Sequence, residues 1–288
     1  MNRIDLHMHT TASDGKLSPE EIVDWAIEKE IPVISITDHD TVEGSKKAIN
    51  YSKGKKIRVV PGIEVTADPQ DFGGDLHIVG LFVDYSNDEF EKMTSEKIRV
   101  SKITAQKIIG NLNKFGFDIT IEEVEKETQK QHYGRPHIAR VLLRKYPDRF
   151  KDRKQVFNEF LGSQGKAYVP PIAPNLKQVI DFIHKTKGLA ILAHSWYFKD
   201  KLDTVLNLFL KSGGDGIEII SCSESDISQE VENKLRKFAN DNNLVVSSGT
   251  DFHEKIVGER EIGDRGINLQ EFNKLAERHR KIFLEKDL

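Results

Sequence analysis

Seven short apolar runs, separated mainly by helical patterns, constrain the fold of this chain more than any other feature. Most of the runs are continuously apolar rather than alternating, which is typical of parallel strands that are covered on both faces. Because parallel strands need long crossover connections, the pattern predicts an α/β fold, and seven units favour a barrel-like closure. The predicted strands are residues 3–8, 32–37, 58–65, 76–83, 188–194, 216–221 and 244–250.

Local helix signals support this alternation. Ser18 and Glu21 have the spacing of a capping box, with a proline directly after the serine. Asn175 opens a second amphipathic pattern, and Gly54 is placed to end the helix that begins near Val42. These signals place helices between several of the predicted strands.

One long stretch interrupts the alternation and shows helical periodicity only. It contains a second capping box, formed by Thr120 and Glu123. We therefore predict a small helical insert over residues 89–168, and a barrel formed by residues 1–88 and 169–288.

The charge is divided unevenly along the chain. The formal net charge is only −3, but residues 95–166 contain 16 Lys and Arg against 9 Asp and Glu, a local excess of +7. The remainder therefore carries −10. A single chain rarely needs such a division for solubility, so we expect the acidic part to hold cations and the basic part to meet an anion.

Composition excludes several classes of protein. The 288 residues contain no stretch near the roughly 20 apolar residues of a membrane helix. The first ten residues lack the apolar core of a signal peptide, so a cytoplasmic location is expected. Cys222 is the single cysteine, which excludes a disulfide framework and a cysteine-based zinc site.

Six histidines and three carboxylates stand at or near the predicted strands. Alternate residues on a strand point to one face, so His7 and His9 can hold one ion together, as can Asp251 and His253. In a parallel barrel the carboxyl ends of the strands meet at one mouth, where these side chains would converge. Imidazole and carboxylate ligands without thiolate suit Mn, Fe or Zn. Nine candidates exceed the needs of one ion, so more than one divalent ion is expected, with Glu64 able to bridge a pair.

Simpler explanations exist for single members of this set. A lone histidine inside a strand, such as His77, is more often a packed core residue than a ligand. Asp5, Asp38 and Asp40 lie beside the candidate histidines, and we expect them to support ligands or cap helices rather than to bind metal.

The motifs IDLHMHTTASDG, ITDHDT, PGIEVT, LHIVG, LAHS and GTDFH resemble, in order, those of the PHP (polymerase and histidinol phosphatase) family of metal-dependent phosphoesterases. The resemblance implies a distorted (β/α)7 TIM-like barrel with up to three metal ions at its mouth. One departure is Ser195, where the family usually has proline, and it removes no ligand. By motif, one ion would bind to His7, His9, Glu64 and Asp251, a second to Glu64, His77 and His194, and a third to Asp14, His39 and His253.

Residues 134–140, GRPHIAR, resemble the RPHIA motif of the subgroup named after the tryptophan-operon-linked PHP protein. That subgroup includes phosphatases for nucleoside 3',5'-bisphosphates, such as 3'-phosphoadenosine 5'-phosphate, and 5'-to-3' exonucleases acting on short RNA. Pro136 suits the first turn of a helix, which places Arg135 and His137 at a helix N-terminus, where anions bind. We predict that both contact substrate phosphate, the alternative being that Arg135 only pairs with a surface carboxylate. Arg140 is expected to lie in solvent.

These observations together predict a phosphoesterase acting on a nucleotide or on short RNA, with catalytic roles for His194, Asp251 and Arg135. Two alternatives stay open: a histidinol-phosphate phosphatase with the same metal set, and a non-catalytic metal-binding PHP module that serves a polymerase or another partner. Neither a membrane nor an obligate protein partner is expected.

Overall fold

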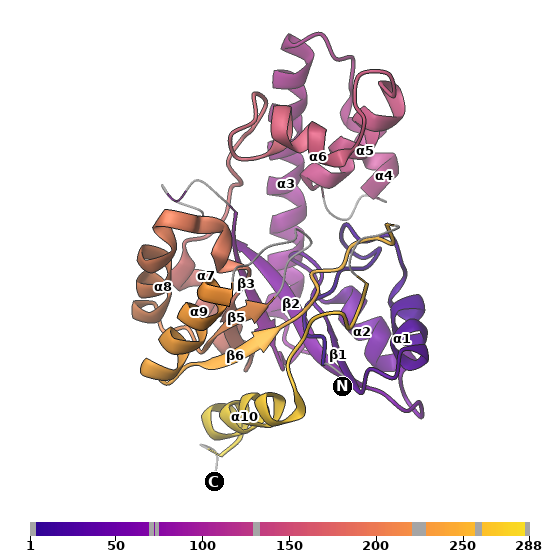
Figure 1. Ribbon diagram of the computed structural model, residues 1–288. Coiled ribbons are helices and arrows are strands. Elements are labelled where there is room, and N and C mark those ends of the chain that lie inside the picture. Colours follow the sequence, from indigo (N-terminus) through magenta and orange to yellow (C-terminus); the bar gives the residue numbers. More distant parts are fainter. Residues whose placement is uncertain are drawn as a thin grey trace.

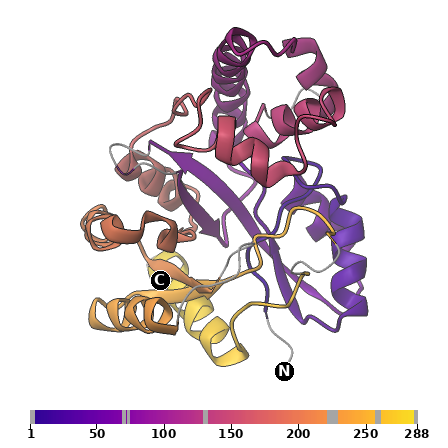
Figure 2. The same ribbon diagram turned by 45° about the horizontal axis from the view of Figure 1, so that its top comes forward.

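A curled six-stranded sheet forms the centre of the computed structural model, which describes residues 4–68, 72, 75–128, 133–220, 229–256 and 261–285 (Figures 1 and 2). The strands follow one another across the sheet in chain order. They are β1 (Val33–Ile36), β2 (Arg58–Ala67), β3 (Leu76–Leu81), β4 (Leu189–Leu192), β5 (Gly216–Ile220) and β6 (Val245–Ser248).

Strand β3 runs against its neighbours, whereas we predicted that all strands would be parallel. The pairs β1–β2, β4–β5 and β5–β6 are parallel, but β3 is antiparallel to both β2 and β4. Only residues 68–75 separate β2 from β3, which is too short for the crossover that a parallel pair needs. The apolar pattern of a strand does not depend on the direction in which the strand runs. The residues of β3 themselves therefore gave no sign that this strand is antiparallel.

The first predicted strand, residues 3–8, is not a regular strand among the described residues. Residues 4, 5 and 8 make isolated bridges only. On one side Asp5 N donates to Val33 O of β1 at 3.2 Å, and on the other Leu6 N donates to Ser248 O of β6 at 3.0 Å. This segment therefore lies between β1 and β6, but the described sheet has six strands with one reversed, not seven repeating parallel units.

Helices flank the curled sheet, with α2 packed against β1 and β2, α7 against β2, β3 and β4, and α9 against β5 and β6. In the view of Figure 1, α1 and α2 lie at the right of the sheet and α7, α8 and α9 at the left. The C-terminal helix α10 packs against β6. The helices of this part are α1 (Pro19–Glu28), α2 (Glu43–Tyr51), α7 (Leu176–Lys185), the 3-10 helix η3 (Ser195–Lys201), α8 (Leu202–Lys211), α9 (Gln229–Asp241), α10 (Leu269–His279) and the π-helix η4 (Arg280–Leu284).

The predicted helix signals are confirmed. Ser18 and Glu21 form a reciprocal capping box at the start of α1, and Asn175 with Gln178 forms another at α7. Gly54 has φ +78° shortly after α2 ends, a left-handed conformation that glycine adopts without a Cβ clash.

The segment predicted as a helical insert stands over one end of the sheet (Figures 1 and 2). It has its own hydrophobic core, whose buried members all lie between residues 105 and 167. Each fully buried leucine there, such as Leu142, contributes about 1.5–3 kcal/mol. Its helices are α3 (Glu89–Lys114), α4 (Ile121–Thr128), α5 (Arg135–Lys145), α6 (Arg153–Val156) and the π-helix η2 (Phe157–Leu161).

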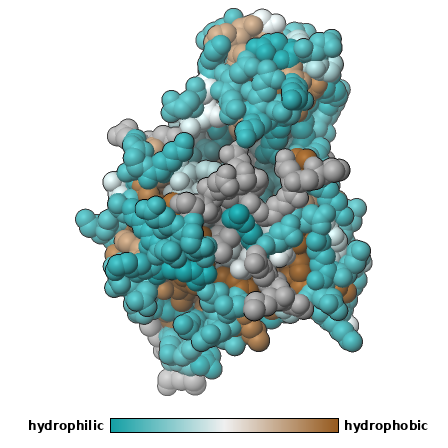
Figure 3. Space-filling view, in the orientation of Figure 1, coloured by the Kyte–Doolittle hydropathy of each residue, from teal (hydrophilic) through white to brown (hydrophobic). Residues whose placement is uncertain are grey.

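The face of the molecule in Figure 3 is mainly hydrophilic, over the insert as well as over the part that contains the sheet. Within the described residues, no helix combines the length and the apolar composition needed to cross a bilayer.

Candidate metal centre and the cavity above it

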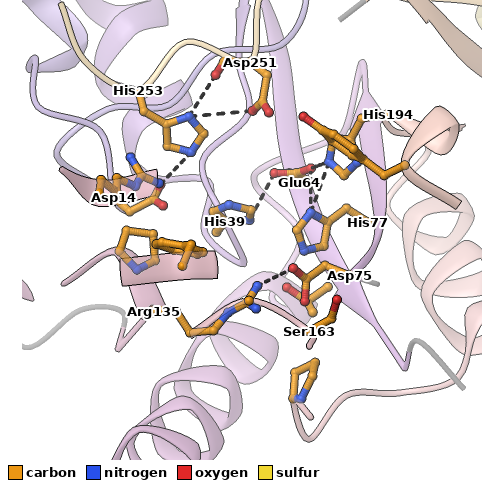
Figure 4. Close-up of a pocket in the computed structure, with 18 of the residues that line it drawn as sticks. Asp14, His39, Glu64, Asp75, His77, Arg135, Ser163, His194, Asp251 and His253 are labelled. Atoms are coloured by element: carbon orange, nitrogen blue, oxygen red, sulfur yellow. Dashed lines mark hydrogen bonds and ion pairs between the residues drawn. The ribbon is translucent and has the colours of Figure 1, made fainter. Parts of the chain in front are cut away.

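The structure brings all nine predicted ligands together at one end of the sheet (Figure 4). Most of them follow a strand or lie near the end of one. His77 is the exception, because it stands near the start of β3, opposite Thr66 of β2. Since β3 is antiparallel, its start lies at the end of the sheet where β2 finishes, so the reversed strand delivers His77 to the cluster. The ligand candidates are His7, His9, Asp14, His39, Glu64, His77, His194, Asp251 and His253.

Glu64 on β2 is the centre of this cluster and is fully buried. Its Oε1 lies 3.1 Å from His77 Nδ1 and 3.0 Å from His194 Nε2. Its Oε2 lies 3.0 Å from His39 Nδ1. Burial would raise the pKa of this carboxyl group, but the neighbouring imidazoles, His39 first, hold the pKa well below its usual range. Glu64 is therefore a carboxylate whose two oxygens both lie near imidazole nitrogens.

Three groups within the cluster have ligand atoms close enough to hold an ion, each within 4.8 Å of the others. We name each after its carboxylate. The Glu64 group consists of His39, Glu64 and His77. His194 lies beside this group, because the Nε2 of His194 is 3.2 Å from His77 Nδ1. The Asp251 group consists of His7, His9 and Asp251, and the Asp14 group of His9, Asp14, His39 and His253.

The chemistry of these donors fits divalent cations. Every donor is an imidazole nitrogen or a carboxylate oxygen, which suits Mn, Fe or Zn. His9 Nδ1 and Glu64 Oε2 are buried and have no hydrogen-bond partner among the described residues. A buried polar atom without a partner costs about 1–3 kcal/mol, and a bound cation would remove that cost.

Backbone strain gathers at the same place. His194 has φ 29° and Asp251 has φ 53°, in the left-handed region that non-glycine residues seldom adopt. The family's usual proline in place of Ser195 would bias His194 towards an extended conformation. The serine found here permits the observed turn into η3, and His194 still reaches the cluster.

Asp5 and Asp38 hold the loops that carry the ligands, as we expected from the sequence. Asp5 accepts hydrogen bonds from the backbone N and the hydroxyl of Thr250, next to Asp251. Asp38 does the same for Thr10, next to His9. Burial raises the pKa of Asp5 to about 6, although its hydrogen bonds act in the opposite direction.

Glu218 on β5 supports the cluster and was missed by the sequence analysis. It is buried, its Oε1 lies 2.8 Å from His7 Nδ1, and its Oε2 accepts a hydrogen bond of 2.8 Å from the backbone N of His194. The available signal was one acidic residue within the apolar run 216–221. Carboxylates that bind the second nitrogen of a ligand histidine fix the orientation of its ring.

We expect Glu218→Gln to weaken metal binding about 10–100-fold, because His7 loses its carboxylate anchor. Equilibrium dialysis against Mn²⁺ with elemental analysis measures this change. Glu232→Gln is the control, since Glu232 pairs with Arg236 on α9. Equal metal affinity in the Glu218 variant and the control would show that Glu218 does not orient a ligand.

A cavity of about 1460 Å³ separates the cluster from the insert. Its floor contains the acidic cluster, and cationic side chains from both parts of the chain line it. These are Lys97, Arg135, Arg153, Lys154, Lys199 and Arg265. Lys97, Arg135, Arg153 and Lys154 belong to the basic stretch 95–166, whereas Lys199 and Arg265 come from the rest of the chain, so the division of charge along the sequence accounts for four of these six cations.

Arg135 is held firmly at the wall of this cavity, at the start of α5. Its guanidinium pairs with Asp75 and donates to Leu161 O at 3.0 Å (Figure 4). Its Cζ lies 5.8 Å from the ring centroid of Phe157 and 5.5 Å from that of Tyr168. Arg135 therefore does pair with a carboxylate, which was the alternative to a phosphate contact. This carboxylate, Asp75, lines the cavity and lies two residues before His77 in the sequence.

Two expectations about the insert need correction. His137 is only 1% exposed and is not among the cavity-lining residues, which is against a contact with substrate. Arg140, expected in solvent, is partly buried and donates to Asp14 O. The contact of Arg140 arises from how the insert docks on the rest of the chain, which local sequence patterns do not encode.

The sequence is similar to those of known proteins over most of its length. The chain is 30% identical over 256 residues to the 5'-3' exoribonuclease Rnm of Escherichia coli (strain K12), covering 87% of this chain and 85% of that protein. It is 28% identical over 272 residues to the 3',5'-nucleoside bisphosphate phosphatase of Chromobacterium violaceum, covering 91% of each.

The fold is shared as well. A solved structure from Bifidobacterium adolescentis, described as a candidate metal-dependent phosphoesterase, superposes with a TM-score of 0.83 at 24% identity over 95% of both chains. The family model described as the PHP domain matches residues 5–242, which is well over half of the chain. With the same motifs meeting at one buried cluster, the chain belongs to the PHP domain family.

Proposed function

We propose that this protein is a metal-dependent phosphoesterase that hydrolyses phosphate esters of nucleotides. The proposed substrate is a nucleoside 3',5'-bisphosphate, such as 3'-phosphoadenosine 5'-phosphate, or the 5' end of a short RNA. The observation that carries the proposal is the buried cluster of nine potential ligands facing cationic side chains across one cavity. The names of two relatives, an exoribonuclease and a bisphosphate phosphatase, support the class of substrate.

The proposed cofactors are two or three divalent ions, Mn, Fe or Zn, held by the Glu64, Asp251 and Asp14 groups. The ligand sets inferred from the motifs differ slightly from these groups, since His9 and His39 each belong to two of them. When bound, such ions would neutralise phosphate oxygens and lower the pKa of a water, so that it loses a proton and supplies the hydroxide that attacks phosphorus. Glu64, with one oxygen near His39 and the other near His77, would help to hold these ions.

Arg135 is proposed to bind and orient the phosphate. Its partners Asp75, Leu161 O and the two aromatic rings fix the guanidinium plane before substrate arrives, so little side-chain freedom is lost on binding. A guanidinium offers paired donors that match phosphate oxygens. Such positioning and charge neutralisation supply most of what phosphoryl transfer requires.

The wider organisation belongs to the same proposal. Residues 1–88 and 169–288 would form the catalytic core, a distorted seven-stranded barrel in which the segment near His7 completes the sheet between β1 and β6. Residues 89–168 would cover the active site. A cytoplasmic location and the lack of an obligate protein partner stay predictions.

Hydrolysis assays with Mn²⁺ test the proposed function. The panel contains a nucleoside 3',5'-bisphosphate, a nucleoside monophosphate, a 5'-phosphorylated short RNA and histidinol phosphate. We expect turnover of the bisphosphate or the RNA to exceed that of histidinol phosphate. Preference for histidinol phosphate would support the alternative phosphatase, and no turnover of any ester would support the non-catalytic module.

Arg135→Ala is expected to lower kcat/KM for the preferred nucleotide about 10–100-fold, because a hydrogen bond to a charged group contributes about 1.5–3 kcal/mol. Metal content should not change, since Arg135 contacts none of the nine ligand candidates. Arg144→Ala is the control, as Arg144 lies on the same helix and pairs with Glu127 within the insert. Unchanged kcat/KM in the Arg135 variant would exclude the proposed contact.

A further inference from the structure

Three cationic side chains of the insert reach down to the barrel. Lys97 of α3 lies 3.1 Å from Asp40 and donates to Thr66 O at 2.8 Å. Arg140 of α5 donates to the backbone O of Asp14. Arg153 of α6 lies 3.5 Å from Glu254.

All three contacts fall on segments that supply the Asp14 group. Asp40 follows His39 directly, and Glu254 follows His253 directly. Asp14 is itself a member of the group. Asp14 lies in a turn, His253 follows the bridge residue Phe252, and His39 makes an isolated bridge with Glu64. An insert cation contacts each of these three segments.

The other histidines are supported from the barrel instead. Glu218 of β5 holds His7 through its ring and His194 through its backbone N. The Glu64 group has two members on strands β2 and β3, where ladder hydrogen bonds fix the backbone. The two kinds of support differ in origin, because one comes from the sheet and the other from the docked insert.

Arg140 makes the most direct of these contacts. Its guanidinium reaches from α5 across to a carbonyl that belongs to a ligand residue, and burial lowers the pKa of Arg140 although the Asp14 carboxylate opposes that effect. The segment around Asp14 is a turn, without strand neighbours on either side. The turn has hydrogen bonds of its own, such as Gly15 N to Thr10 O at 2.9 Å and Lys16 N to His253 O at 2.8 Å. Arg140 adds a further one at the carbonyl of the ligand residue itself, where metal binding requires close positioning.

We propose that Arg140 is a positioning residue for the metal ion of the Asp14 group, and that docking of the insert completes this site. The insert would then have a second role besides covering substrate. The same helix, α5, would carry both Arg135, which is proposed to bind phosphate, and Arg140, which positions a ligand of one metal ion. The inference rests on the metal set of the proposed function. It concerns one ion and leaves the Glu64 and Asp251 groups independent of Arg140.

The test measures Mn²⁺ binding to the full chain by equilibrium dialysis and calorimetry, without substrate. Arg140→Met keeps a long apolar side chain but removes the donors. We expect one Mn²⁺ equivalent to bind about tenfold or more weakly, the usual effect of removing support from a ligand, while the other equivalents are unchanged. Arg144→Met, one turn further along α5 and paired with Glu127, should bind all equivalents as the wild type does.

A double-mutant cycle separates positioning from general loss of stability. Asp14→Asn removes the carboxylate that Arg140 is proposed to position, so adding Arg140→Met to it should weaken binding no further. Thermal unfolding of all four proteins without metal shows whether they fold alike. Full additivity, equal weakening of every equivalent, or the same loss in Arg144→Met would overturn the inference.

The outcomes also separate this inference from the proposed function. If Asp14→Asn loses one equivalent but Arg140→Met loses none, only the role of Arg140 fails. If Asp14→Asn binds as many equivalents as the wild type, the Asp14 group holds no ion and both fail. A changed KM with unchanged Mn²⁺ binding in Arg140→Met would instead make Arg140 a substrate contact.

Discussion

Replacing Asp251 with asparagine is expected to abolish hydrolysis and to remove metal from the protein. Asp251 Oδ1 lies 3.1 Å from His9 Nε2 and 3.4 Å from His7 Nε2, in the group that has only these three members. Loss of a charged ligand there would forfeit several kcal/mol of charge stabilisation in the transition state. Since about 1.4 kcal/mol is tenfold in rate, we expect turnover to fall about 10³-fold or more.

Asparagine is a better replacement than alanine because of the backbone at this position. Asp251 has φ 53°, and asparagine tolerates the left-handed region, whereas alanine there costs about 1 kcal/mol. The asparagine variant therefore tests the charge of the ligand and leaves the loop in place. Elemental analysis of the purified variant gives the metal content, and thermal unfolding checks that it folds.

Asp40→Asn is a matched control for this variant. Asp40 also has a positive φ, 54°, and lines the same cavity, but it belongs to none of the three ligand groups. Instead, Asp40 accepts a hydrogen bond from the backbone N of Thr66 and forms an ion pair with Lys97. We expect the control to keep the metal of the Asp251 group. Full activity and full metal content in Asp251→Asn would remove Asp251 from the ligand set.

The parts of this molecule that were predictable from sequence are those set by local patterns. Ser18 and Asn175 cap helices through side chains a few residues away, so their roles are visible in a short window. The convergence of His7, His39 and Asp251 follows from a general property of α/β folds, that functional side chains gather at one end of the sheet. Both kinds of inference need no knowledge of long-range packing.

The unpredicted parts depend on contacts between distant elements. The direction of β3 changes no apolar position, although the short connection over residues 68–75 was a usable signal. Glu218 was visible as an acid in an apolar run, but nothing local shows that it faces His7 across 211 positions. Arg140 looked exposed because its helix was considered alone, without the barrel loop that it meets.

Metal removal is expected to abolish activity and to lower the unfolding temperature, both reversibly. Ions that bind only the folded state stabilise it by about 4 kcal/mol at a thousandfold excess over Kd, or on the order of 10 °C for a chain of this size. A chelator should therefore destabilise the protein, and added Mn²⁺ should restore stability and turnover together. Turnover that survives complete removal of metal would exclude the proposed mechanism.

The stabilisation of the fold by bound metal should depend on pH, because metal ions and protons compete for the same imidazoles. Burial lowers the pKa of His253, but the carboxylates of Asp14 and Asp251 together raise the pKa to about 9. His7 likewise has a pKa well above its usual value, since Glu218 and Glu64 outweigh its burial. Both histidines must lose a proton before they can hold an ion, so metal binding should release protons and tighten as pH rises.

The raised pKa of His253 also determines how the stability of the metal-free protein changes with pH. A histidine whose pKa is about 9 when folded and about 6.5 when unfolded stabilises the fold below pH 6.5, and this contribution is lost as pH rises through 9. Metal-free protein should therefore lose stability from pH 6.5 to 9, whereas binding of Mn²⁺ strengthens over the same range. The difference in unfolding temperature between the two forms should widen with pH. Scanning calorimetry of both forms at pH 6.5, 8 and 9 measures this difference, and a constant gap would show that these histidines are not metal ligands.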